Sequence, residues 1–94
     1  MGPAATLFRV NDETDAIALA NDSEFGLGAS IWTEDMQKTE KIAGKIKCGA
    51  VLINAMVASN PDLPFGGTEK TGFGRELGRY GILEFVNSKT VYLD

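Results

Sequence analysis

Apolar and polar positions along residues 1–54 form short blocks that predict strands and helices in turn. The predicted strands are 4–10, 28–32 and 50–54, and the predicted helices are 13–20 and 33–47. Asp12 offers an N-cap for the first helix, with Asp15 three residues on, and Thr33 offers a cap for the second. The order strand, helix, strand, helix, strand predicts an α/β fold: a parallel βαβαβ sheet with right-handed crossovers.

The pattern changes after Asn54. Residues 55–74 combine Asn60-Pro61, Pro64 and a cluster of glycines, which predicts a loop of about twenty residues. Loops of that length inside compact domains are usually functional. A third helix is predicted over 75–87 and an alternating strand over 89–94, and such a terminal strand needs a partner for its backbone groups.

The composition is that of a globular protein with a thin core. The 94 residues are 44% hydrophobic and carry a net charge of −4, so nucleic acid and anionic membranes are poor partners. No apolar run approaches the roughly 18 to 20 residues of a membrane span, and no signal peptide is visible, so we expect a cytoplasmic location. One cysteine and no histidine argue against an internal disulfide and against a thiolate or imidazole metal site.

The glycine-rich stretch 64–81 first suggests a cradle for phosphate, because glycine lets backbone N–H groups approach an anion. The spacing argues against that reading. Gly72, Gly74 and Gly78 give G-x-G-x-x-x-G instead of the dinucleotide fingerprint, and no P-loop Lys-Ser/Thr follows Gly66 and Gly67. An anion-binding domain therefore stays only as a third alternative.

Other candidate chemical groups have structural explanations that we favour. Cys48 is the only thiol and lies between a predicted helix and a predicted buried strand, without a histidine to activate it. The carboxylates at the helix starts fit capping and dipole roles; they are Asp12, Glu13, Asp15, Glu34 and Asp35. Arg75 and Glu76 follow the glycines and could anchor the loop or receive a ligand, and we favour the anchoring role.

Seven blocks in order resemble the C-terminal end of the aldehyde dehydrogenase superfamily, and the resemblance is closest to bacterial succinate-semialdehyde dehydrogenase. The blocks are GP at 2–3, ALAND at 18–22, FGLGASIWTED at 25–35, GAVLIN at 49–54, PFGG at 64–67, K-T-G-F-GRE-G within 70–78 and EFVNSKTV at 84–91. The resemblance implies that 1–54 belongs to the catalytic domain, that 55–74 is a substrate-entrance or anchor loop, and that 75–94 is a helix with an oligomerisation strand. It also implies that the glycines serve close backbone packing.

The family oxidises an aldehyde to the acid with NAD or NADP, using a cysteine nucleophile and a glutamate base. The resemblance places both residues, and the cofactor domain, before Met1, which stands where the family's E-x-F-G-P motif has Phe. We therefore expect a C-terminal fragment with no catalytic residues, no bound cofactor and no metal, which is inactive by itself. We expect a homo-oligomer formed through strand 89–94; the alternative function is a non-catalytic interaction module that docks onto intact subunits.

The long loop gives a narrower indication of substrate. Ser59 lies five places after Asn54 and Pro64 ten places after it, a spacing similar to the succinate-semialdehyde branch. In that branch a loop serine helps to hold the substrate's distal carboxylate, so the resemblance implies substrate binding by Ser59. The alternative is that Ser59 caps a turn before Asn60-Pro61.

Overall fold

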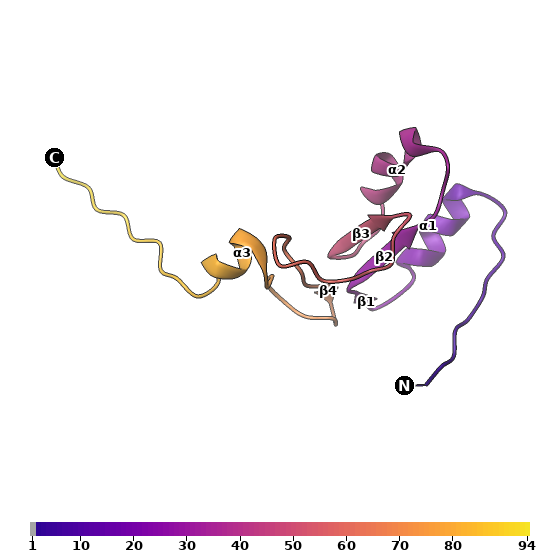
Figure 1. The fold of residues 1–94 in the computed structure, drawn as a ribbon, viewed down its shortest axis with the longest axis horizontal. Coiled ribbons are helices and arrows are strands. Elements are labelled where there is room, and N and C mark those ends of the chain that lie inside the picture. Colours follow the sequence, from indigo (N-terminus) through magenta and orange to yellow (C-terminus); the bar gives the residue numbers. More distant parts are fainter. Residues whose placement is uncertain (1) are drawn as a thin grey trace.

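A computed structural model describes residues 2–94 and shows an elongated α/β arrangement (Figure 1). The helices are α1 (Glu13–Asn21), α2 (Met36–Ala43) and α3 (Gly78–Leu83), and the strands are β1 (Phe25–Gly26), β2 (Gly28–Ile31), β3 (Ala50–Ile53) and β4 (Thr68–Glu69). The sheets and α1 and α2 lie together at one end of the chain, and α3 and the C-terminal tail extend away from them.

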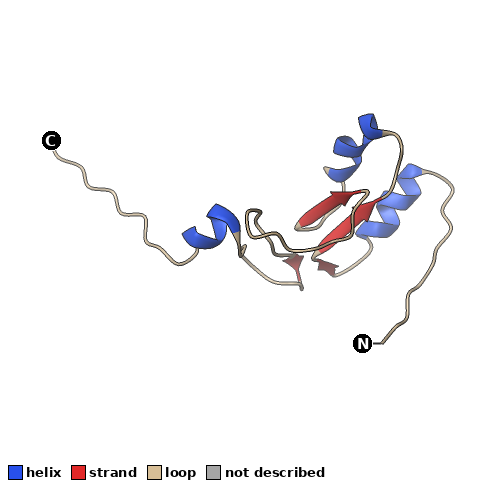
Figure 2. Ribbon diagram, viewed as in Figure 1, coloured by secondary structure: helices blue, strands red, loops and turns tan. Residues whose placement is uncertain are grey.

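The predicted parallel pairing is confirmed for β2 and β3. Gly28 pairs with Ala50 and Ile31 with Ile53, and α2 forms the crossover between the two strands (Figure 2). Side chains from α1, α2 and β2 line one shared apolar slot, whereas the segment 58–65 lies with β3 around a second hollow. The two longer helices therefore border β2, and the long loop borders β3.

Both longer helices begin at an aspartate. Asp12 Oδ1 accepts the Asp15 N–H at 2.9 Å, which confirms the predicted N-cap of α1. The predicted cap of α2 at Thr33 is wrong, because Asp35 Oδ1 accepts the Gln37 N–H at 3.2 Å. Thr33 is held before the helix instead: its Oγ1 accepts the Asp35 N–H at 3.0 Å.

Two asparagine side chains fasten the ends of these elements. Asn54 follows β3, and its amide donates to Thr33 O at 2.9 Å and accepts from Thr33 N at 2.8 Å, which continues the β2–β3 pairing by one step. Asn21 ends α1; its amide donates to Lys45 O and accepts from Lys47 N, both at 2.8 Å. Each side chain thus takes the place of a missing strand or turn partner for the backbone.

The predicted loop 55–74 contains regular structure. Its β4 pairs antiparallel with β1, and Lys70 Nζ lies 2.6 Å from Glu24 Oε2 beside that pair. Phe65 and Glu76 exchange two backbone hydrogen bonds, each 2.7 Å long. Two-residue strands leave no periodic pattern, which is why the sequence did not indicate them.

Three predicted elements differ from the structure. Segments 4–10 and 89–94 are extended but form no strand within residues 2–94, because no other backbone lies beside them to share hydrogen bonds. The helix predicted over 75–87 is shorter. The bridge to Phe65 uses the backbone of Glu76, and Leu77 has φ 63° and ψ 167°, which no helix accommodates.

The described residues form no closed apolar core. No hydrophobic side chain in residues 2–94 is buried, and the radius of gyration is 17.0 Å, against about 12 Å for a compact domain of this length. No described helix has the length and apolar character needed to cross a bilayer. The fold therefore depends on backbone pairing and local caps, with extensive apolar surface left uncovered.

Thr68, in β4, and Thr71, just after it, provide a matched test at the β1–β4 pair. Thr71 Oγ1 accepts the N–H of buried Gly26 at 2.8 Å, whereas Thr68 Oγ1 is buried without a partner among the described residues. We expect Thr71→Val to lower the free energy of unfolding by about 1–3 kcal/mol, because it orphans a buried donor, and Thr68→Val to be neutral or stabilising. Urea unfolding at a fixed chain concentration measures both, and an equal loss in the two variants would contradict this account.

Candidate functional site

The glycine-rich segment packs directly against the start of β3. A Cβ built on Gly49 would overlap the Gly66 carbonyl oxygen and lie 2.7 Å from the Gly66 carbonyl carbon. Gly67 lies against Thr71 and the Gly26 carbonyl oxygen, and the Gly49 N–H donates to that same oxygen at 3.0 Å. This geometry confirms the expectation of close backbone packing at Gly66 and Gly67, whereas a Cβ on Gly72 would have nothing within 4 Å.

Arg75 holds this segment through hydrogen bonds to backbone carbonyl oxygens of the segment itself. Its Nη1 donates to the carbonyl oxygens of Gly67 and Gly74, at 2.9 Å and 2.7 Å. Glu76 contributes its backbone to the bridge with Phe65. The structure therefore gives both residues the anchoring role that we favoured from the sequence.

The same contacts decide whether the glycine-rich segment could bind a nicotinamide dinucleotide. A dinucleotide needs free backbone N–H groups and space for its pyrophosphate. Here the space beside Gly66 and Gly67 is taken by the backbones of Gly26 and Gly49, and the Arg75 guanidinium faces backbone carbonyls. The glycine-rich segment thus does not fit a dinucleotide, and the position of Met1 lies outside the described residues.

The loop with Ser59 runs across the β3 face of the sheet. Ser59 is exposed, and within residues 2–94 its hydroxyl takes part in no hydrogen bond. The turn that follows is closed by Asn60: its Oδ1 accepts the Asp62 N–H at 2.9 Å and its carbonyl oxygen accepts the Leu63 N–H at 3.0 Å. Asn60 instead of Ser59 therefore caps this turn within residues 2–94.

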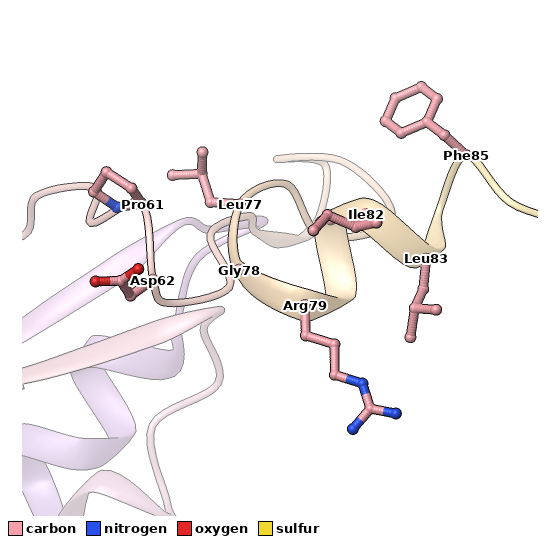
Figure 3. A pocket seen from close by; sticks show the side chains of 9 residues that line it. Pro61, Asp62, Leu77, Gly78, Arg79, Ile82, Leu83 and Phe85 are labelled. Atoms are coloured by element: carbon pink, nitrogen blue, oxygen red, sulfur yellow. The ribbon is translucent and has the colours of Figure 1, made fainter.

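Two hollows border this loop. One of about 260 Å³ lies beneath it and includes Ala58 and Asn60, the neighbours of Ser59. The other has a volume of about 690 Å³ and lies between the 61–62 turn and α3 (Figure 3). Figure 3 shows the Arg79 and Leu83 side chains on the same side of α3. This larger hollow is an open surface with exposed apolar walls at Ile82 and Phe85, and only Asp62 and Arg79 supply charge.

The remaining candidate groups have structural roles. The Cys48 thiol is half-buried and donates to the Ala50 carbonyl oxygen at 3.0 Å, so it packs beside β3 as expected. Asp12 and Asp35 cap helices, and Glu13 and Asp15 occupy the first turn of α1. Within residues 2–94 no three metal-ligating side chains come together around one point.

Sequence reasoning missed three side chains that shape the site. Asn21 and Asn54 hold the connections around the sheet, and Asn60 forms the turn beside Ser59. Asn60 carried a signal, because Asn before Pro favours a turn in which the side chain accepts a backbone N–H two residues on. The other two carried none, since their partners lie 24 or 21 residues away in the chain.

The geometry describes a small α/β unit with a long loop and without a catalytic constellation among the described residues. The chain belongs to the aldehyde dehydrogenase family, whose model matches residues 1–91. The match covers nearly the whole chain and agrees with the seven sequence blocks.

Several similar proteins of this family are succinate-semialdehyde dehydrogenases. A probable succinate-semialdehyde dehydrogenase [NADP(+)] from Synechocystis sp. is 56% identical over 92 residues, which are 98% of this chain and 20% of the relative. The succinate-semialdehyde dehydrogenase [NADP(+)] of Deinococcus radiodurans is 47% identical over 90 residues, covering 96% of this chain and 19% of that protein. The chain thus spans about one fifth of the length of these relatives.

Solved structures share the fold. The succinic semialdehyde dehydrogenase of Streptococcus pyogenes in complex with NADP+ superposes with a TM-score of 0.86 at 42% identity, over 89% of this chain and 18% of that one. An aldehyde dehydrogenase from Bacillus cereus in its NAD+ complex gives a TM-score of 0.93 at 34% identity, over 99% and 19% of the two chains.

Gly49 tests the packing role of the glycines. We expect Gly49→Ala to lower the free energy of unfolding by about 1–3 kcal/mol, because the added methyl group meets backbone atoms that cannot rotate away. Gly44→Ala is the matched control: Gly44 has φ −64° and ψ −15° at the end of α2, and a Cβ there makes ordinary contacts. The control should be neutral or stabilising by up to about 1 kcal/mol. Urea unfolding compares the two, and a harmless Gly49→Ala would show that the approach is not close.

Proposed function

We propose that this chain is the part of a succinate-semialdehyde dehydrogenase that carries the substrate loop and an oligomerisation segment. The whole enzyme oxidises succinate semialdehyde to the carboxylic acid with NAD or NADP. The chain alone is inactive. The names of the relatives support the reaction and the substrate, and family membership supports the place of the chain within a larger subunit.

The observation that carries this proposal is the uncovered apolar surface of residues 2–94. Leu7, Trp32 and Phe73 are 95%, 66% and 103% exposed, and no hydrophobic side chain is buried. Surfaces of this kind mark sites of contact with other protein. In the whole enzyme, segment 4–10 gains a neighbouring strand, which completes the parallel βαβαβ arrangement.

Ser59 supplies the substrate contact in this proposal. Its exposed hydroxyl donates a hydrogen bond to an oxygen of the distal carboxylate, and cationic side chains from the rest of the enzyme share that carboxylate. Such a contact acts on substrate binding instead of on the chemical step, because the distal carboxylate does not react.

The reacting groups belong to the rest of the enzyme. Cys48 faces a backbone carbonyl beside β3, and the chain has no histidine to take its proton. The glycine-rich segment does not fit the cofactor. What this chain contributes is therefore positioning: a loop held against the sheet, with the Ser59 hydroxyl exposed on it.

A hybrid enzyme tests the proposal. The chain replaces the matching 92 residues of the Synechocystis relative. We expect the hybrid to reduce NAD(P)+ with succinate semialdehyde, and the 94-residue chain alone to show no turnover. In the hybrid, Ser59→Ala should raise the KM for succinate semialdehyde about tenfold, because one hydrogen bond to a charged group is lost, and leave the KM for butanal unchanged.

Ser88→Ala, in the exposed tail, is the control and should match the hybrid in both KM values. Turnover by the isolated chain would refute the division of labour. A folded but inactive hybrid would refute the proposal as a whole.

The C-terminal tail supports a second part of the function. Val91 and Leu93 are 76% and 87% exposed in an extended segment that has no backbone partner within residues 2–94. We propose that 89–94 pairs as a strand with another subunit and makes the chain a homo-oligomer. The same pairing supports the alternative function, a non-catalytic module that docks onto intact subunits.

Two substitutions at Val91 distinguish strand pairing from nonspecific hydrophobic association. Val91→Pro removes a backbone donor and blocks pairing, whereas Val91→Thr keeps a β-branched side chain. In sedimentation at micromolar concentration we expect oligomers for the unmodified chain and for Val91→Thr, and monomers for Val91→Pro. A monomeric unmodified chain would remove the proposal, and oligomers of Val91→Pro would show that another surface drives association.

A further inference from the structure

We infer that Asn60 is a positioning residue that fixes where the Ser59 hydroxyl is presented; the inference rests on the proposed function of Ser59. Asn60 adjoins Ser59 and closes the turn that follows it by accepting two hydrogen bonds, one from Asp62 N–H at its side-chain Oδ1 and one from Leu63 N–H at its backbone carbonyl oxygen. A side-chain acceptor of this kind holds the turn when no strand or helix does.

The segment around Ser59 is attached on both sides. Before it, the half-buried Val57 side chain lies against β2, where a Cβ on Gly28 would come within 2.8 Å of Val57 Cγ1. After it, the Gly78 N–H of α3 donates to the Pro61 carbonyl oxygen at 2.9 Å. Only three peptide units separate Val57 from Asn60, about 11 Å when extended, so the turn at Asn60 limits where Ser59 can move.

The Asn60 side chain is the part of this attachment that a substitution can remove cleanly. Asn60 is exposed, so Asn60→Ala opens no cavity, and it leaves the backbone bonds in place. It removes only the acceptor of the Asp62 N–H. Because hydrogen bonds weaken steeply with distance and angle, a wider range of Ser59 positions weakens the contact with the carboxylate.

The hybrid enzyme provides the test. We expect Asn60→Ala to raise the KM for succinate semialdehyde about threefold to tenfold, with kcat within about twofold and the KM for butanal unchanged. Asn60→Ser keeps a neutral acceptor for the same turn and should restore most of the binding. Asn11→Ala removes an exposed amide that donates to Asp15 at 2.9 Å, far along the chain from the loop, and should have no effect.

The outcomes separate the two claims. If Ser59→Ala leaves both KM values unchanged, the proposed substrate contact fails. If Ser59→Ala acts as expected but Asn60→Ala behaves like the unmodified hybrid, or Asn60→Ser is as impaired as Asn60→Ala, the inference about Asn60 is overturned. If Asn60→Ala does not fold, Asn60→Ser is compared with Asn11→Ala, and a KM for succinate semialdehyde that is much higher in Asn60→Ser overturns the inference. An equal rise in the KM values for succinate semialdehyde and butanal in Asn60→Ala also overturns it.

Discussion

The contact between the Gly49 and Gly66 backbones holds the two parts of this chain together. Residues 13–54 form the sheet and its helices, and residues 65–76 form a separate hairpin-like segment. No buried apolar side chain joins them within residues 2–94, so the join consists of close backbone packing, the β1–β4 pair and the hydrogen bond from Gly26 N–H to Thr71 Oγ1. The absence of side chains on those glycines is therefore a condition of the fold.

A join without buried apolar side chains contributes little hydrophobic free energy to folding. Burial of apolar surface is the main favourable term in folding, and here the large side chains of α3 and both extended segments contribute little of it. The stability available from such a surface is realised only when another protein surface covers it. The length of 62 Å along the longest axis has the same cause, since nothing draws α3 or the tail onto the sheet.

The sequence correctly predicted the features that depend on residues close together in the chain. The Asp12 cap, the β2 and β3 strands and the parallel crossover follow from periodicity and capping, and the structure confirms them. Thr33 failed as a cap because α2 begins later, at Met36, where Asp35 Oδ1 accepts the Gln37 N–H. The third helix failed at its start because Glu76 pairs with Phe65. At the candidate site, the sequence indicated the loop and singled out Ser59. It could not indicate the packing of Val57 on Gly28, because that packing depends on tertiary contacts.

The turn at 60–63 links the candidate substrate contact to the C-terminal segment. Leu77 lies in a region of φ and ψ that costs of order 1–3 kcal/mol for a residue with a side chain, and such conformations persist only where the surroundings fix them. Gly78, at φ 56°, fits closely against the turn: a Cβ there would lie 3.1 Å from the Asp62 carbonyl oxygen. Because α3 begins at that residue, its direction is fixed by the same turn that borders Ser59. The proposed oligomerisation tail and the proposed substrate contact at Ser59 are therefore connected through one turn, built from Asn60, Pro61 and Gly78.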